Sequence, residues 1–246
     1  MATVRVDTSE LVKLRERFAK MREQLPFATA QALTQTAQAG QAAVRQEMTR
    51  VFDRPTPYIL DSTFIKPATK TNLEAHVYLK DIAGKAIAPA KAIGHEVTGG
   101  GRAWKRSEGA LRNAGLMGAN ENAVPGQAAK LDAYGNISRG QMQQIMSALR
   151  ANFDPYQNRS SSRRSQRNAS RAGNIFYSSG RPGTGQTKVP RRGVWARDVR
   201  GRLKLLLVII KTPKYKQRID LQSISDSVSA QHWDDAVAAA WDKAIK

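Results

Sequence analysis

The sequence contains no cysteine among its 246 residues. Disulfide bonds, thiol nucleophiles and thiolate metal sites are therefore excluded. Histidine is scarce as well, because the three residues His76, His95 and His232 are scattered along the chain. Acidic residues number 20 against 40 Lys and Arg, and no pair of carboxylates is placed for acid–base work. We therefore expect no enzyme, no catalytic residue, no metal site and no cofactor.

Long apolar runs are also missing. The longest extends from Leu205 to Ile210, far short of the roughly 20 residues that a membrane-spanning helix needs. The first ten residues, Met1 to Glu10, lead into a charged helical pattern without the apolar segment of a signal peptide. We expect a soluble protein, or part of a soluble assembly, with no membrane partner.

Two segments resemble functional motifs without completing them. His95 and Glu96 could begin a zinc-protease helix motif, but position 99, where a second histidine is needed, is glycine in a run not expected to be helical. The segment Gly180 to Lys188 looks like a phosphate-binding loop, yet Gln186 stands where that loop needs lysine. Neither segment predicts chemistry.

The strongest signal is positive charge. Between Arg159 and Lys204, thirteen basic residues face one acid, Asp198, so this stretch carries +12 of the formal net charge of +20. Such a field requires a polyanion or an acidic protein surface opposite it. Few aliphatic residues occur between Phe153 and Val194, and this composition predicts an extended or disordered arm over residues 152–193.

Three interpretations of the arm remain open: it orders on adjacent subunits of an assembly, it contacts nucleic-acid phosphates, or it is a disordered linker. The first is favoured. The residues predicted to contact another subunit or a polyanion are Arg159, Arg163, Arg164, Arg167, Arg171, Arg181, Lys188, Arg191, Arg192 and Arg197.

The predicted fold class is α+β. Apolar residues at 3–4 spacing predict helix over the first fifty residues, in which Pro26 either kinks one long helix or opens a second. A stripe of small residues from Leu33 to Met48 suits close packing. Segments 62–67 and 73–79 are expected to form an antiparallel hairpin, 81–94 to be loop or weak helix, and 120–133 to be loop.

Further elements follow along the chain. Short helices are predicted over 107–115 and 139–149, a buried strand over 203–210 and an amphipathic helix over 226–245, with Val237 on its packed face. We expect an amino-terminal body (1–151) with long helices on a small antiparallel sheet, an inserted basic arm (152–193), and a strand and helix (194–246) that complete the same body.

Two stretches resemble a known family. The first is the helical region and hairpin from Val6 to Leu79, centred on Pro26 to Ala37; the second is the strand Leu203 to Ile210, followed by Pro213 to Leu221 and the terminal helix. Together they resemble the minor tail protein Z family and the related tail-completion proteins of long-tailed bacteriophages. Segments 93–100, read as an edge strand with a glycine pair, and 131–140 look like phrases of prophage structural proteins.

The resemblance implies a virion protein of the tail or neck, present in the host cytoplasm during assembly. It would form a ring with other copies of itself, contact other neck or tail proteins and help join the tail to the head, with DNA in the channel as a further candidate partner. The alternative function is a free nucleic-acid-binding protein that contacts phosphates through the basic arm. An enzyme such as a nuclease is the least favoured.

Overall fold

The computed structural model describes residues 9–84, 87–172, 174–181 and 190–245. The fold is α+β, as predicted, and it divides into two compact units. Unit 1 comprises Met1–Ile82 and Arg218–Lys246, and unit 2 comprises Ala83–Gln217. This division differs from the expected single body, because the carboxy-terminal strand belongs to unit 2 while the terminal helix belongs to unit 1.

Unit 1 is built on one long helix, α1 (Ser9–Val51), which continues through Pro26. Proline removes one intrahelical hydrogen bond, and the surrounding turns hold the helix together across it. The stripe of small residues is packed as predicted, since Ala37, Gly40, Val44 and Met48 are all buried. Pro55 follows the end of the helix.

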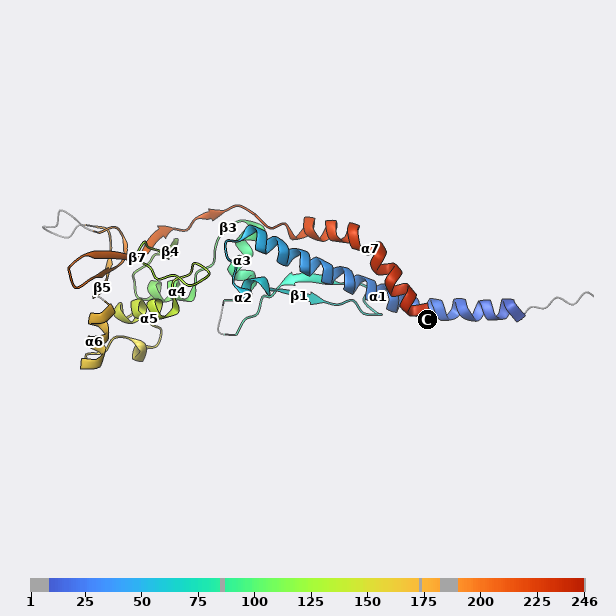
Figure 1. The fold of residues 1–246 in the computed structure, drawn as a ribbon, viewed down its shortest axis with the longest axis horizontal. Coiled ribbons are helices and arrows are strands. Elements are labelled where there is room, and N and C mark those ends of the chain that lie inside the picture. Colours follow the sequence, from blue (N-terminus) through green and yellow to red (C-terminus); the bar gives the residue numbers. More distant parts are fainter. Residues whose placement is uncertain (1–8, 85–86, 173, 182–189, 246) are drawn as a thin grey trace, which may run out of the picture. The chain divides into compact units, whose positions relative to one another are not determined.

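The terminal helix α7 (Leu221–Ile245) lies along α1 (Figure 1). Ala28 and Ala32 of α1 meet Ala236 and Ala240 of α7 in a small core. Alanine side chains are small enough to let the two helix backbones approach closely. The face of α7 that packs against α1 therefore contains Ala236 and Ala240. Val237 was predicted to lie on this packed face, and that prediction is wrong, because the residue is 37% exposed. The helix also starts at Leu221 rather than at residue 226.

The predicted hairpin covers the small-residue stripe of α1. Strands β1 (Thr63–Lys66) and β2 (His76–Leu79) pair antiparallel, after the short helix α2 (Pro57–Leu60). Half-buried Val77 and Leu79 alternate with exposed His76 and Tyr78, the pattern of a strand with one solvated face. A Cβ atom on Gly40 would lie 3.7 Å from Val77 Cγ2, so strand and helix are in contact there.

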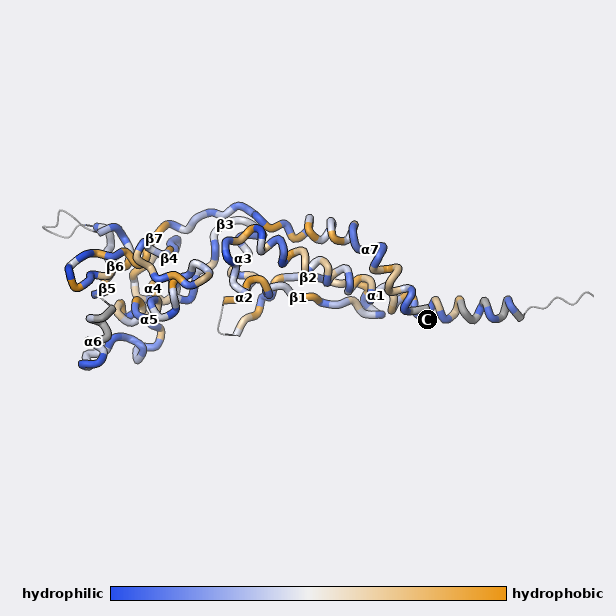
Figure 2. Tube along the Cα trace, in the orientation of Figure 1, coloured by the Kyte–Doolittle hydropathy of each residue, from blue (hydrophilic) through white to orange (hydrophobic). Residues whose placement is uncertain are grey.

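Unit 2 contains a four-stranded antiparallel sheet in the order β4-β7-β6-β5. Its strands are β4 (Glu121–Pro125), β5 (Asn174–Ser178), β6 (Gly193–Arg197) and β7 (Leu203–Lys211). Figure 2 shows the hydrophobic run along β7, the predicted strand, which is central in the sheet. Helices α4 (Arg106–Asn113) and α5 (Arg139–Ala148), both predicted, pack their apolar residues into the core of the sheet.

The expected extended arm is not seen in the described part of residues 152–193. A 3-10 turn η1 (Pro155–Gln157) and helix α6 (Arg163–Ala172) lead into strand β5. The reason is tertiary: Ile175 is 7% exposed because β6 pairs with β5 and places it in the core, which local composition does not reveal. Residues 182–189 lie outside the described residues. Strand β4 likewise falls where a loop was expected.

Segment 93–100 is corrected as well. It was expected to be an edge strand, but helix α3 (Pro89–Thr98) occupies most of it and buries Ile93 and Glu96. Proline suits the first turn of a helix, and Gly99, with a φ of 76°, follows the last helical residue. The strand character is limited to β3 (Gly100–Gly101), which pairs with β8 (Lys214–Tyr215).

Candidate polyanion-binding surface

The two units carry very different charge. Unit 2 contains 25 Lys and Arg against 6 Asp and Glu, a net charge of +19. Unit 1 contains 15 basic and 14 acidic residues, a net charge of +1. Nearly all of the excess charge therefore belongs to one unit of the fold, and it extends beyond the stretch singled out from the sequence.

The six acidic side chains of unit 2 all have partners inside the unit. Glu108, Glu121 and Asp198 each accept hydrogen bonds from an arginine side chain. Glu96 lies beside a histidine. Asp132 and Asp154 accept backbone N–H groups in turns. The six carboxylates therefore stabilise local structure. Because unit 2 has 25 basic residues, most of its positive charges have no carboxylate in the unit to neutralise them.

Glu108 is the most deeply placed of these acids, with 1% of the residue exposed. Arg102 donates two hydrogen bonds to its carboxylate, at 2.8 and 2.5 Å, and the N–H groups of Lys105 and Ala123 each donate another at 2.7 Å. Burial alone would raise the pKa of Glu108, but these four donors outweigh it and lower the pKa below its usual range. The pair ties α4 to strand β4.

Arg192 is one of the predicted contact residues, and its side chain forms hydrogen bonds within unit 2. Its guanidinium binds both oxygens of Glu121 and also donates to the Tyr177 hydroxyl at 3.2 Å. Glu121 lies on β4 and Tyr177 on β5, the two outer strands of the sheet. The Arg192 guanidinium therefore links side chains from the two outer strands, and its charge is largely offset by Glu121.

A second group of basic residues surrounds Asp198 in the turn between β6 and β7. Arg202 Nε donates to Asp198 at 2.9 Å, and Lys204 Nζ lies 3.7 Å from the same carboxylate. Burial alone would raise the pKa of Asp198, but hydrogen bonds from the backbone and side chain of Arg202 and from the Arg200 backbone lower it below its usual range. Arg197, also a predicted contact residue, is exposed and lies over the Phe176 ring at 5.9 Å.

Helix α6 presents the least compensated charge. Arg163, Arg164 and Arg167 are exposed and form no ion pair with another described residue. Two of the three lie in the first helical turn, where positive charge opposes the helix dipole at a cost of about 0.3–1 kcal/mol each. The helix dipole therefore disfavours the charges of Arg163 and Arg164, and an external anion is the partner that the charge of the three arginines suits.

The other predicted contact residues are distributed around this helix and the sheet edge. Arg159, Arg181 and Arg191 are exposed; the side chain of Arg171 and all of Lys188 lie outside the described residues. Sequence reasoning missed Arg139 and Arg150, exposed residues at the two ends of α5, the helix that contacts α6. No motif marks them. We define the α6 surface as Arg159, Arg163, Arg164 and Arg167, together with Arg139, the first residue of α5, and Arg150, two residues after the end of that helix.

Unit 2 also has a pocket of about 350 Å³ between α4, α5 and the sheet. Glu108 is the one carboxylate in its lining, and it is already occupied by Arg102. Lys105 also lines the pocket, and desolvation followed by the nearby Arg102 charge lowers the pKa of its ammonium group.

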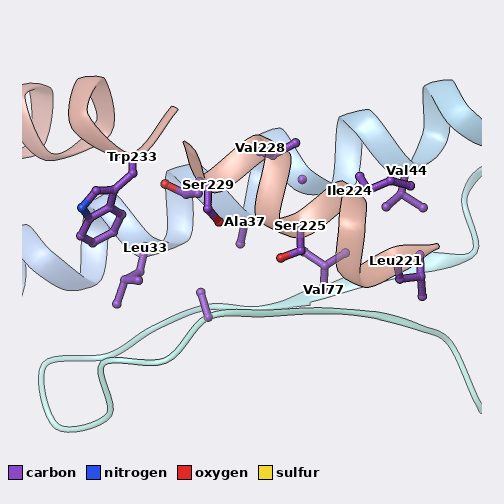
Figure 3. Close-up of a pocket in the computed structure, with 13 residues that line it drawn as sticks. Leu33, Ala37, Val44, Val77, Leu221, Ile224, Ser225, Val228, Ser229 and Trp233 are labelled. Carbon is purple, nitrogen blue, oxygen red and sulfur yellow. The ribbon is translucent and has the colours of Figure 1, made fainter. Parts of the chain in front are cut away.

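An apolar pocket of about 160 Å³ lies in unit 1 between α1, the hairpin and α7. Figure 3 shows Leu33 and Trp233 at one end and Val44 and Leu221 at the other. The polar groups in its lining are the hydroxyls of Thr36, Ser225 and Ser229, and no titratable side chain lines it. It has room for an apolar group.

The zinc motif considered for His95 is incomplete in the structure too. Both His95 and Glu96 are helical, contrary to expectation, with His95 Nε2 3.2 Å from Glu96 Oε1, but the helix ends at Thr98 and position 99 is glycine. Within residues 9–84, 87–172, 174–181 and 190–245, no group of three His, Asp or Glu is placed to hold a metal ion.

No family model matches the chain, and neither the curated proteins nor the solved structures contain a significant match to it. Among the described residues, no helix has the length and apolar character needed to cross a membrane.

Proposed function

We propose that this chain is a structural virion protein of a tailed bacteriophage, a minor tail or tail-completion protein of the neck. In this role it forms a ring with other copies and helps join the tail to the head. The observation that carries the proposal is the separation of charge in one chain, +1 in unit 1 and +19 in unit 2. The resemblance of the amino- and carboxy-terminal segments to tail-completion proteins supports it.

The two units suit different contacts in such an assembly. Unit 1 is close to neutral and rich in helix, so it can pack against protein without strong self-repulsion. Unit 2 presents the α6 surface, whose arginines suit an acidic neighbour or the phosphates of DNA in a channel. The mechanism proposed is geometric, with no catalytic step, and its site is the virion after assembly in the host cytoplasm.

The decisive experiment is made on phage particles. Mass spectrometry of purified virions should detect the chain in several copies, and a phage lacking it should accumulate heads and tails that are not joined. Restoring the chain in trans should restore joined particles. Normal particles in its absence, or virions without the chain, would overturn the proposal.

A second candidate function is a free nucleic-acid-binding protein. The observation that favours it is the same +19 charge of unit 2, since phosphate contacts account for most non-specific binding. Its test is binding of duplex and single-stranded DNA by the isolated chain across a range of salt. Nanomolar affinity at physiological salt by a chain that remains monomeric would favour this function over the virion role.

A further inference from the structure

The amino-terminal part of α1 extends beyond the helix that packs on it. Figure 1 shows its first turns projecting past the carboxy-terminal end of α7, within unit 1. No described side chain from Glu10 to Phe27 is buried, and the first buried residue of α1 is Ala28. We call residues 9–27 the projecting segment.

The projecting segment carries an apolar stripe at coiled-coil spacing. Phe18, Met21 and Leu25 follow one another at intervals of three and four residues, and the same spacing continues through Leu14 and Leu11 in the sequence. Phe18 is 60% and Leu25 50% exposed. A repeat of this kind is the a/d seam of a two-helix interface.

The segment gains little from the rest of the chain. Most helical stability in proteins comes from packing of an apolar face. Here Phe18 and Leu25 of that face are exposed to solvent. Packing this stripe against a second helix would remove the exposed Phe18 and Leu25 from water and stabilise the segment.

The charges that flank the seam indicate the partner. Arg15 and Arg22 occupy the position after each d residue (e), and Arg17 and Gln24 occupy the position before an a residue (g). In a parallel pair of identical helices Arg17 would oppose Arg22, which disfavours a second copy. We propose that the projecting segment docks a helix of a different protein, with an apolar seam flanked by Glu or Asp. This inference does not depend on the phage role, because unit 1 alone carries it.

The experiment uses the full chain and two synthetic helical peptides of three heptads. Both peptides have leucine at a and d, one with Glu and the other with Lys at e and g. We expect the acidic peptide to bind the chain, and to bind the double variant Phe18→Ser with Leu25→Ser at least about tenfold more weakly, a loss of about 1.4 kcal/mol. The control variant, Lys20→Ser with Glu23→Ser on the outer face, should bind like the parent.

A charge-reversed variant provides a second test that leaves the stripe intact. Arg15→Glu with Arg22→Glu should reverse the preference, so that the basic peptide binds better than the acidic one. Equal binding of both peptides, or of neither, would overturn the proposal. So would sedimentation that shows a dimer of the chain dissociated by the Phe18 and Leu25 substitutions, because the occupant would then be a second copy.

Discussion

Arg102 and Glu108 form a bidentate ion pair in unit 2, with N–O distances of 2.8 and 2.5 Å, and only 1% of the Glu108 side chain is exposed. The carboxylate also accepts the N–H groups of Lys105 and Ala123. One acidic side chain therefore joins the start of α4, the Arg102 segment and strand β4. Among the six acidic residues of unit 2, Glu108 therefore has the role of holding these segments together.

Replacing Glu108 with Gln should destabilise unit 2 strongly. The change leaves the guanidinium of Arg102 largely buried without a counter-charge, and breaking such a pair typically costs about 3–5 kcal/mol. Urea unfolding followed by circular dichroism measures the difference. Asp81→Asn, at an exposed position, is the matched control and should change the free energy of unfolding by less than about 0.5 kcal/mol. Equal stability of the two variants would contradict the assigned role of Glu108.

The same pair predicts a pH dependence. The folded pKa of Glu108 is lowered, so its contribution is complete above the ordinary Glu value of about 4.3 and is lost as the pH falls through that value toward the folded pKa. Unfolding free energies measured from pH 6 to pH 3 should fall less steeply for Glu108→Gln than for the parent chain. Parallel curves would show that other carboxylates account for the acid sensitivity.

Gly193 should not tolerate a side chain. Its φ is 154°, and a Cβ atom there would lie 2.2 Å from the Leu207 carbonyl oxygen on the neighbouring strand. Gly193→Ala should destabilise the sheet by about 1–3 kcal/mol or more. Gly140→Ala is the control, because it lies in α5 with open space around it and should be neutral or stabilising by up to about 1 kcal/mol. Thermal unfolding of both variants distinguishes the two effects.

The seam between α1 and α7 should be sensitive to side-chain volume. Ala240 is 1% exposed against α1, so Ala240→Leu should destabilise unit 1 by about 1–3 kcal/mol through overpacking. Ala238→Leu places the same side chain at an exposed position of the same helix and should have little effect. A stable Ala240→Leu variant would show that the helices separate easily at this seam.

The α6 surface should dominate the binding of polyanions. Substituting Arg163, Arg164 and Arg167 with Ala should lower the salt concentration at which the chain elutes from heparin, because three phosphate-like contacts are lost together. The control removes the same charge from unit 1 through Lys20→Ala, Lys66→Ala and Lys70→Ala, all at exposed positions. An equal shift in both variants would mean that net charge alone, rather than this surface, determines retention.

Local patterns were sufficient to predict the elements whose signal lies in their own residues. The heptad-like stripe of α1, the alternation of β1 and β2, and the apolar run of β7 each specify an element without reference to the rest of the chain. The same holds for α4 and α5. The predicted contact residues remain predictions: exposure of Arg163, Arg164 and Arg167 is compatible with them, whereas Arg192 is engaged with Glu121.

Composition alone determined the charge of this protein and its lack of thiol chemistry, and the spacing of apolar residues predicted its α+β class. Only the tertiary structure decided where the charge is compensated and which segments are strands. Ile175 and Asn122 lie in stretches with few apolar residues, and both become buried because the neighbouring strands β6 and β7 supply the hydrogen bonds and the core. Long-range pairing of this kind leaves no local periodicity, so a basic, serine-rich stretch that resembles an arm contains an ordered helix and the edge strand of a sheet.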